Sequence, residues 1–329
     1  MKGTVLVARP DSAGDVLLAG PAIRAVSAHG RRVVLLAGPL GRAAAELLPG
    51  VDRVIEWRTP WIDADPPPVT REHVDRLMTL LPDADEALIL TSFHQSALPL
   101  ALLLRLRGVG RITAISDDYP GSLLDVRVQV DESSHLPEAE RMLAVARAAG
   151  FDGGDAALAV RPPPPSVVGP PGYVVVHPGT NAPARAWPPE RHREAVEALA
   201  CEGFTVVVTG GGGERALTAA VAGRHGVDLG GLTSLAELAG VLGDACALVA
   251  GNTGPAHLAA AVGTPVVSLF APVVPAERWA PYGVPSVLLG DQEAACKDTR
   301  ARLCPVRGHP CLSGVTAEQV VKAVRELVT

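Results

Sequence analysis

Short apolar, β-branched segments alternate with helical segments along the 329-residue chain, and this alternation constrains the fold more than any other feature. The runs at 4–8, 32–37 and 87–91 are apolar at almost every position, as in strands that are buried on both faces. The alternation predicts an α/β fold in which helices cover both faces of a parallel sheet. In the first half we expect strands at 4–8, 32–37, 51–57, 87–91, 111–115 and 126–130, and helices at 16–26, 40–48, 71–81, 94–107 and 136–149.

A proline-rich stretch separates two halves of similar size. It begins with the run Arg161-Pro162-Pro163-Pro164-Pro165 and continues to Gly172. Proline lacks the N–H that helices and central strands need, so this stretch acts as a stiff spacer. The strand–helix pattern starts again at 173–176 and continues with strands at 205–209, 247–250 and 266–270. We therefore predict a first domain over 1–161, a linker over 162–172, a second domain over 173–315 and a C-terminal helix over 316–329.

The composition argues against nucleic acid as a partner and against a membrane span. The net charge is -6 and only 3% of the residues are aromatic, which leaves neither a basic footprint nor base-stacking platforms. No apolar run reaches the roughly 18 to 20 residues of a spanning helix. A secretory signal is not visible before the strand at 4–8. We expect a cytoplasmic protein, for which peripheral contact with a membrane surface stays open.

Three of the five cysteines lie close together near the C-terminus. Cys296, Cys304 and Cys311 are separated by seven and six residues, whereas zinc ribbons and fingers pair their cysteines across two. An odd number of cysteines also argues against a disulfide framework. We interpret this segment as a reduced, partly buried loop and predict no metal site.

The turn at 251–257 is the clearest candidate binding loop. It joins the strand at 247–250 to a helix of small residues, and it carries Asn252, Thr253 and Gly254, then Pro255 and His257. A helix that begins here presents free N–H groups and the positive end of its dipole, which suits a phosphate or diphosphate. Glycine allows close approach of a ligand, and proline fits the first helical turn. An ordinary, well-capped loop remains the alternative.

A second candidate loop follows the first strand and contains Asp11, Gly14 and Asp15. Ligands of open α/β sheets bind at the carboxyl ends of the strands, where this loop lies. Asp15 stands where the next helix begins. It is either a first-turn acid that complements the helix dipole or a general base that faces a substrate. The position alone slightly favours the first interpretation, whereas Gly14 directly before it supports the second, because a substrate could come close.

Other signatures narrow the chemistry. The glycine run at 210–213 lacks the G-x-G-x-x-G spacing of dinucleotide folds, and neither a P-loop nor a G-x-S-x-G elbow occurs. Glu214 follows the glycine run and either complements a helix dipole or binds a ribose. Ser234 and Glu237 form a predicted capping box. Arg185 lies in a loop after a central strand and is either solvated or an anion ligand.

Four blocks of the sequence together resemble glycosyltransferase family 9, the ADP-heptose:lipopolysaccharide heptosyltransferases and their relatives. The blocks are 9–18, 177–188, 209–214 with 232–235, and 252–257, and the segments 135–150 and 304–311 are also similar. The resemblance implies a GT-B architecture, with two Rossmann-like domains that face each other across a cleft. It also implies an inverting, metal-independent transfer from a nucleotide-diphosphate sugar, without a further cofactor, to a glycan or glycolipid such as lipopolysaccharide core.

The resemblance also implies roles for single residues. Asp15 would be the general base on the acceptor side, in the loop with Asp11 and Gly14. The donor diphosphate would lie against Thr180, Arg185, Asn252, Thr253, Gly254, Pro255 and His257, and the nucleoside against Glu214, Leu232 and Ser234. The last helix would cross back to the first domain in some members. Family members commonly carry aspartate at the position of Asn252, which puts the identity of the donor in question.

Two alternatives from other functional classes remain open on the sequence. A nucleotide-sugar epimerase or hydrolase of the same architecture would need further acids in the donor domain, where the motifs offer only Glu214. A non-catalytic nucleotide-sugar binding protein would have no use for Asp15.

Overall fold

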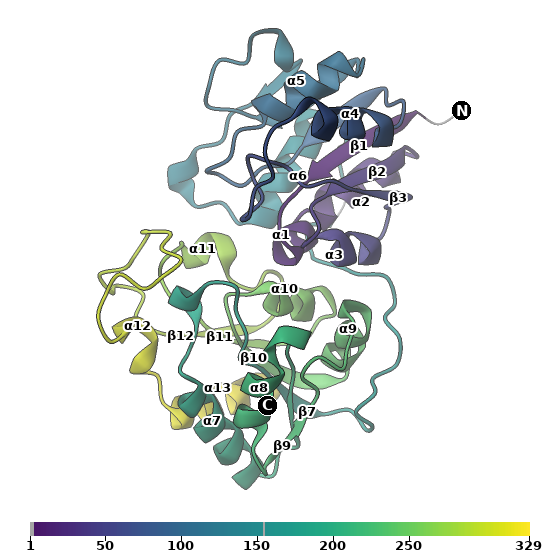
Figure 1. Cartoon of the computed structure of the whole chain (residues 1–329). Helices are drawn as coiled ribbons and strands as arrows, with labels where there is room; N and C mark the ends of the chain where they lie inside the picture. Colours follow the sequence, from purple (N-terminus) through teal and green to yellow (C-terminus); the bar gives the residue numbers. More distant parts are fainter. Residues whose placement is uncertain (1–2, 154) are drawn as a thin grey trace. The chain divides into compact units, whose positions relative to one another are not determined.

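The computed structural model describes residues 3–153 and 155–329, and it divides into two compact units, Met1–Arg161 and Pro162–Thr329. Each unit contains a six-stranded sheet (Figure 1), with the strand orders β3-β2-β1-β4-β5-β6 and β12-β11-β10-β7-β8-β9. All neighbouring strands in both sheets are parallel. The predicted α/β class with two parallel sheets is confirmed.

The first unit follows the predicted alternation closely. Its strands are β1 (Thr4–Arg9), β2 (Arg32–Ala37), β3 (Arg53–Glu56), β4 (Glu86–Ile89), β5 (Arg111–Ile115) and β6 (Val126–Val128). Its helices are α1 (Ala13–Leu18), α2 (Gly20–Ala28), α3 (Arg42–Leu47), α4 (Arg71–Leu80), α5 (Leu98–Leu106) and α6 (Glu138–Ala148), with short 3-10 turns η1 (Gly121–Leu123) and η2 (Glu132–Ser134).

The second unit repeats the pattern. Its strands are β7 (Tyr173–His177), β8 (Val206–Val208), β9 (Gly226–Asp228), β10 (Ala245–Gly251), β11 (Val266–Leu269) and β12 (Ser286–Leu289). Its helices are α7 (Pro189–Cys201), α8 (Arg215–Ala222), α9 (Leu235–Gly243), α10 (Gly254–Ala261), α11 (Ala276–Trp279), α12 (Pro310–Ser313) and α13 (Ala317–Val328), with the 3-10 turns η3 (Pro183–Arg185) and η4 (Gly212–Glu214).

The strand order in each sheet reverses at one place. In the first sheet the reversal lies between β1 and β4, and in the second it lies between β7 and β10. In open α/β sheets the loops that leave the two strands at such a reversal run to opposite faces, and ligands of this fold class bind there, at the carboxyl ends of the strands. The two candidate loops of the sequence, after β1 and after β10, therefore stand at the two reversal points.

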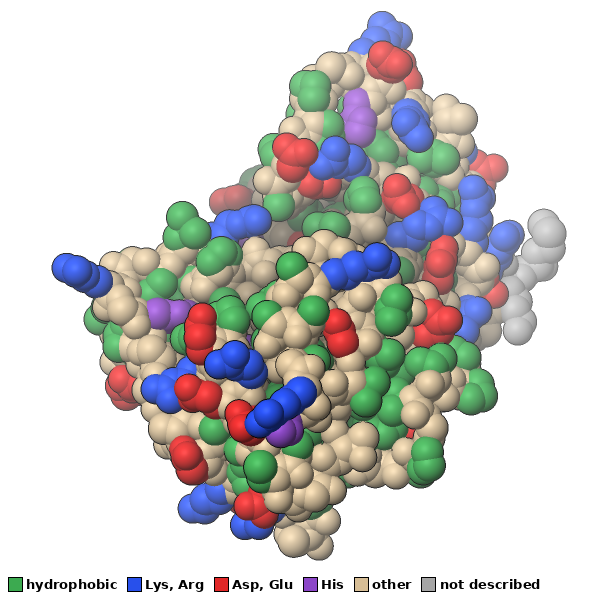
Figure 2. Space-filling view, turned by 60° about the horizontal axis from the view of Figure 1, so that its bottom comes forward, with side chains coloured by type: hydrophobic (Ala, Val, Ile, Leu, Met, Phe, Trp, Pro, Cys, Tyr) green, Lys and Arg blue, Asp and Glu red, His purple; other side chains and the backbone are tan. Residues whose placement is uncertain are grey.

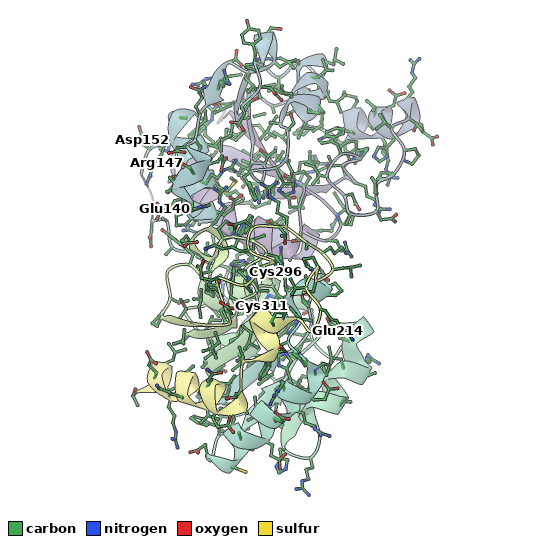
Figure 3. All side chains as sticks on the ribbon, turned by 90° about the vertical axis from the view of Figure 1, so that its left-hand side faces the viewer. Glu140, Arg147, Asp152, Glu214, Cys296 and Cys311 are labelled. Atoms are coloured by element: carbon green, nitrogen blue, oxygen red, sulfur yellow. The ribbon has the colours of Figure 1, made fainter. Side chains whose placement is uncertain are left out.

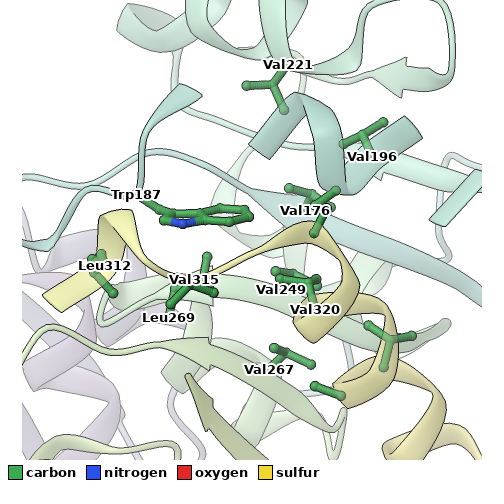
Figure 4. Close-up of a cluster of buried hydrophobic side chains, with 14 of the residues drawn as sticks. Val176, Trp187, Val196, Val221, Val249, Val267, Leu269, Leu312, Val315 and Val320 are labelled. Atoms are coloured by element: carbon green, nitrogen blue, oxygen red, sulfur yellow. The ribbon is translucent and has the colours of Figure 1, made fainter. Parts of the chain in front are cut away.

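Apolar side chains fill both faces of each sheet. In the second unit one face packs against α7, α8 and α13, where Trp187 lies beside Val176, Val249 and Leu312 (Figure 4). Helix α13, which the family resemblance allows to cross to the first unit, has its apolar residues Val320 and Val324 fully buried in this core. On the face drawn in Figure 2, cationic and acidic side chains are interspersed.

Three boundaries differ from the prediction. The helix expected at 16–26 consists of α1 and α2, which meet at Ala19. The helix expected from 94 begins only at Leu98, with Pro99 in its first turn, because the preceding residues form a turn in which the backbone N–H of Ser92 donates to Gln95. Helix α11 and strand β12 were not among the elements predicted from the sequence. Among the described residues, no helix is both long and apolar enough to cross a membrane.

Candidate functional site

Arg9 is the last residue of β1 and is fully buried. Side chains alternate between the two faces of a strand, so Arg9 lies on the face of Val5 and Val7. That face is covered by α2 and α6, whereas Leu6 and Ala8 pack toward α4 and α5. The alternation within one apolar strand therefore carries a guanidinium to the side of α6.

Three carboxylates surround this guanidinium. Arg9 Nε lies 3.1 Å from Asp11 Oδ2, and Arg9 Nη2 lies 3.2 Å from both Asp15 Oδ1 and Glu138 Oε1. Nη2 also donates to Ser92 Oγ at 3.0 Å. Burial lowers the pKa of Arg9, but the three negative charges outweigh it and raise the pKa overall, so that Arg9 stays charged.

Asp15 lies in the first turn of α1, and its carboxylate is held at both oxygens. Arg9 contacts Oδ1, and the hydroxyl of Ser12 donates to Oδ2 at 2.7 Å. Ser12 occupies the N-cap position of α1 but makes no capping bond to the backbone, because its hydroxyl is used on Asp15. The side chain of Asp15 is 22% exposed, so a fixed carboxylate remains accessible at the carboxyl end of β1.

Asp11 points into the protein, and Gly14 is buried within α1. The amide of Gln95 donates to Asp11 Oδ1 at 2.6 Å, and the Asp11 side chain is 9% exposed. Burial raises the pKa of Asp11 to about 6, against the opposing effect of Arg9. The loop after β1 therefore presents Asp15 outward and Asp11 inward.

A second buried arginine completes the charge network. Arg141 of α6 contacts Glu132 at 2.9 Å and donates to the carbonyl oxygen of Thr91 at 2.5 Å. It lies 3.7 Å from Glu138, the acid it shares with Arg9. Arg141 thus ties α6 to η2 and to the end of β4.

In the second unit His177 ends β7 beside Ala250 of β10. Its Nδ1 lies 3.0 Å from the hydroxyl of Thr209, and burial lowers its pKa to about 4, so the ring is neutral at pH 7. His177 was not among the site residues predicted from the sequence. The available signal was its place as the first polar residue at the carboxyl end of a central strand.

The turn after β10 carries most of the residues predicted to contact the donor diphosphate. Helix α10 begins at Gly254 with Pro255 in its first turn, and Thr253 at the N-cap makes no side-chain capping bond within the described part of the chain. The Thr253 hydroxyl instead donates to the carbonyl oxygen of Gly251 at 3.4 Å. Asn252 and His257 are both nearly buried against the turn.

Arg185 approaches the same turn from η3. A Cβ built on Gly251 would stand 3.1 Å from the carbonyl oxygen of Arg185, so the two loops approach each other closely here and a side chain at this place would press on the η3 turn. The hydroxyl of Thr180, on the loop after β7, accepts from the N–H of Ala182 at 3.2 Å. The structure thus brings the loop of Thr180 and Arg185 together with the turn of Asn252 and Thr253.

The cysteine segment holds the η3 turn in place. The backbone N–H of Ala184 donates to the carbonyl oxygen of Arg302 at 3.0 Å, and Nε2 of His309 lies 3.0 Å from the carbonyl oxygen of Ala184. Cys296 and Cys311 are buried (Figure 3), and burial together with the neighbouring Cys296 raises the pKa of Cys311 to about 12. Within residues 3–153 and 155–329, no three His, Cys, Asp or Glu side chains are grouped so that they could hold a metal ion.

Glu214 and the segment 229–234 lie on the other side of this unit's candidate site. Glu214 accepts from the N–H of Gly211 at 2.7 Å, and the N–H of Gly231 donates to the carbonyl oxygen of Gly210 at 2.8 Å. Leu232 is 64% exposed. Ser234 caps α9 by accepting from the N–H of Glu237, which confirms the predicted capping box.

Comparison with known families decides the identity of the chain. The family model for glycosyltransferase family 9 (heptosyltransferase) matches residues 113–309, which is more than half of the chain. The chain belongs to glycosyltransferase family 9. The resemblance found in the sequence is confirmed, and so is the assignment as a glycosyltransferase.

Solved structures agree on the fold of this family 9 glycosyltransferase. An E. coli ADP-heptose LPS heptosyltransferase II superposes with a TM-score of 0.74 at 19% identity, covering 99% of this chain and 98% of that chain. A family 9 glycosyltransferase from Veillonella parvula superposes with a TM-score of 0.77 at 16% identity, covering 99% of this chain and 97% of that chain. E. coli heptosyltransferase WaaC with ADP-2-deoxy-2-fluoro heptose superposes with a TM-score of 0.73 at 22% identity, covering 98% of this chain and 99% of that chain. These likenesses support the GT-B fold. A search among curated protein sequences gives no significant match.

Within the family 9 fold, the structure places the predicted site residues in three groups. Asp15 lies at the reversal point of the first sheet. Thr180, Arg185, Asn252, Thr253, Gly254, Pro255 and His257 lie on the loops at the carboxyl ends of β7 and β10. Glu214, Leu232 and Ser234 follow β8 and β9. Sequence reasoning missed Arg9, because an arginine at the end of an apolar strand gives no local sign of the three acids around it.

Proposed function

We propose that this protein is an inverting, metal-independent glycosyltransferase that moves a heptose from ADP-heptose to a hydroxyl group of a glycan or glycolipid. The proposal includes a cytoplasmic location, an acceptor of the lipopolysaccharide-core type and no cofactor besides the nucleotide-sugar co-substrate. The single observation that carries it is the Asp15 carboxylate, which is fixed at both oxygens by Arg9 and Ser12 and is still partly exposed.

Asp15 would remove the proton from the acceptor hydroxyl. A general base must lie within hydrogen-bond reach of the proton it takes, in a fixed orientation. Ser12 and Arg9 supply that orientation at a reversal point, where the fold class binds ligands. Gly14 adds no side chain that would shield the carboxylate.

The donor diphosphate would bind at the N-terminus of α10 and at Arg185. The first turn of α10 supplies N–H groups that the Thr253 side chain does not cap. A guanidinium binds phosphate oxygens through two parallel bonds. Thr180, Pro255 and His257 would complete this side of the diphosphate. Asn252 would contribute a neutral amide, which adds no repulsion against the phosphates.

The nucleoside would lie between Glu214 and the segment that holds Leu232 and Ser234. The carboxylate of Glu214 suits ribose hydroxyls, and the exposed side chain of Leu232 offers apolar contact. The E. coli heptosyltransferase WaaC has been solved with ADP and with ADP-2-deoxy-2-fluoro heptose, which supports a donor of this class.

In the proposed step the acceptor oxygen attacks the anomeric carbon from the face opposite the diphosphate. The new carbon–oxygen bond forms as the bond to the diphosphate breaks, and the configuration inverts. The acceptor proton goes to Asp15, and ADP leaves with the electron pair of the broken bond. The N–H groups of α10 and the Arg185 guanidinium would stabilise the charge that grows on the leaving diphosphate.

The test measures ADP release from ADP-heptose in the presence of EDTA, with glycolipid and soluble glycan acceptors as separate arms. We expect acceptor-dependent release that falls about 10²-fold or more in Asp15→Asn. Asp52→Asn is the matched control, because this carboxylate of the same unit accepts a backbone N–H from Val33, at 2.7 Å, away from the Arg9 network. Acceptor-independent conversion that Asp15→Asn leaves unchanged would favour the epimerase or hydrolase, and binding without turnover would favour the binding protein.

A further inference from the structure

The Arg9 side chain joins four chain segments at one point. Its Nε contacts Asp11 in the β1 loop, and its Nη1 lies 3.3 Å from the sulfur of Met142 on α6. Its Nη2 contacts the β4 loop at Ser92, helix α6 at Glu138 and the start of α1 at Asp15. Nη1 and Nη2 of the guanidinium therefore donate hydrogen bonds, and Nε forms an ion pair with Asp11.

This arrangement leaves Arg9 little freedom to move. The side chain is fully buried, and the acids on two sides of it, Asp11 and Glu138, are nearly or fully buried too. A planar guanidinium that is bound from several directions is locked in one orientation. The group that contacts Asp15 is thus a rigid part of the core.

Two donors hold the carboxylate of Asp15, one at each oxygen. The bond from Ser12 is short, at 2.7 Å, and comes from a residue of the same turn. The contact with Arg9 is longer, at 3.2 Å, and comes from the sheet. If Ser12 were the only donor, the carboxylate could still rotate about the Cβ–Cγ bond, and it could move together with the loop that carries both residues. The contact with Arg9 ties the second oxygen to the core.

Arg9 also shares its charge among three acids. Asp11 and Glu138 contact the same guanidinium that contacts Asp15. These two acids hold Arg9 in addition to Asp15, so the guanidinium that orients Asp15 is itself held in place.

We propose that Arg9 is a positioning residue for the transfer reaction: it fixes the orientation of Asp15, while Asp11, Glu138 and Ser92 hold Arg9 itself in place. This inference rests on the proposed function, in which Asp15 is the base. A lysine cannot replace Arg9, because one ammonium nitrogen cannot reach Asp11, Asp15, Glu138 and Ser92 from the same place.

The experiment is a double-mutant cycle of Arg9→Lys with Asp15→Asn. We expect Arg9→Lys to lower kcat about tenfold or more while KM for ADP-heptose stays within about twofold, since an interaction with the base acts on the chemical step. In the Asp15→Asn background the same change should lower kcat by less than about twofold, because the group through which Arg9 acts is gone. Arg105→Lys is the matched control: it is an arginine of the same unit whose contacts go to Asp125 and to the carbonyl oxygens of Val109 and Gly110, away from Arg9, and its kcat per folded protein should change less than about threefold.

A second variant keeps the inference testable if Arg9→Lys does not fold. Glu138→Gln removes the charge of one acid that holds Arg9 and preserves the size of the side chain. With Arg9 held less firmly, kcat should fall about threefold or more while KM for ADP-heptose stays within about twofold, and the fall should be less than about twofold in the Asp15→Asn background. The charged groups around Asp15 are Arg9, Asp11 and Glu138, with Arg141 and Glu132 behind Glu138.

The outcomes separate this inference from the proposed function. A wild-type enzyme without acceptor-dependent ADP release contradicts the proposed function, and crystal structures of Arg9→Lys and Glu138→Gln then decide the inference by the position of the Asp15 carboxylate. If transfer occurs and Asp15→Asn slows it as expected, additive effects of Arg9→Lys and Asp15→Asn overturn the inference. An Asp15 carboxylate that keeps its wild-type position in Arg9→Lys also overturns it.

Discussion

The carboxylate of Glu214 lies directly against the Cα of Gly179. A Cβ built on Gly179 would stand 2.0 Å from Glu214 Oε1, so no other residue fits at this position while Glu214 accepts from the N–H of Gly211. The loop after β7 and the glycine run after β8 therefore pack closely together. Glycine is needed at position 179 because a side chain there would collide with Glu214.

This contact predicts that Gly179→Ala acts through Glu214. The added methyl group should displace the carboxylate and weaken ADP binding by about tenfold, as expected for loss of a hydrogen bond to a charged group. Isothermal titration with ADP measures the effect, and Gly179→Ala combined with Glu214→Ala should bind no more weakly than Glu214→Ala alone. Gly213→Ala is the control, because a Cβ there meets nothing within 4 Å. Additive effects would contradict the shared cause.

Arg185→Ala should raise KM for the donor by about 10- to 100-fold, because a phosphate would lose charge-assisted hydrogen bonds. Steady-state kinetics at saturating acceptor measures this change. Arg191→Ala serves as the control, since Arg191 is on the surface of the same unit and pairs with Glu194 at 2.9 Å. Equal effects of the two substitutions would mean that Arg185 acts only through the net charge of the unit.

His309→Ala should weaken donor binding in the same direction as Arg185→Ala but by only about two- to tenfold. It removes one of the two hydrogen bonds that hold Ala184, the neighbour of Arg185, and a single net hydrogen bond contributes about 0.5–1.5 kcal/mol. Titration with ADP measures it, and the surface variant His225→Ala is the comparison. Unchanged binding in His309→Ala would show that the cysteine segment does not support the Arg185 turn.

His192→Phe should make the protein less sensitive to acid. Burial lowers the pKa of His192 to about 3, below its usual value of 6.5. The unfolded chain therefore takes up a proton as the pH falls below about 6.5, while the folded protein does not, and stability is lost progressively down to about pH 3. Between pH 7 and pH 5 this amounts to about 2 kcal/mol of unfolding free energy.

In the wild type the ring of His192 packs edge-on against Trp187, with the two ring centroids 4.8 Å apart, and phenylalanine keeps a ring at this place. The free energy of unfolding is measured by denaturant titration at pH 7 and pH 5 for wild type and His192→Phe. It should decrease less between the two pH values in the variant. The raised pKa of Asp11 works in the opposite sense, since the folded protein holds that proton more tightly between about pH 4 and 6. Because Asp11 is common to both proteins, it cancels in the comparison. An equal decrease in both would contradict the assignment to His192.

Much of the fold was predictable from local patterns. Strands such as β1, β7 and β10 are continuous apolar runs, and their carboxyl ends locate the candidate loops without further information. Strand β12 was missed because Ser286–Leu289 is a short, only partly buried edge strand inside a loop-rich region. The break at Ala19 was missed because apolar spacing continues across it.

The sequence by itself determined the α/β class, the family and the positions of Asp15, Arg185 and the 252–257 turn, because each depends on residues that are neighbours in the chain. Only the tertiary structure decided that Arg9 meets Ser92, Glu138 and Met142, which are 83, 129 and 133 residues away. Strand pairing and helix packing bring these distant groups to one buried point, where desolvation makes every charge depend on its partners. No local pattern in the chain encodes that meeting.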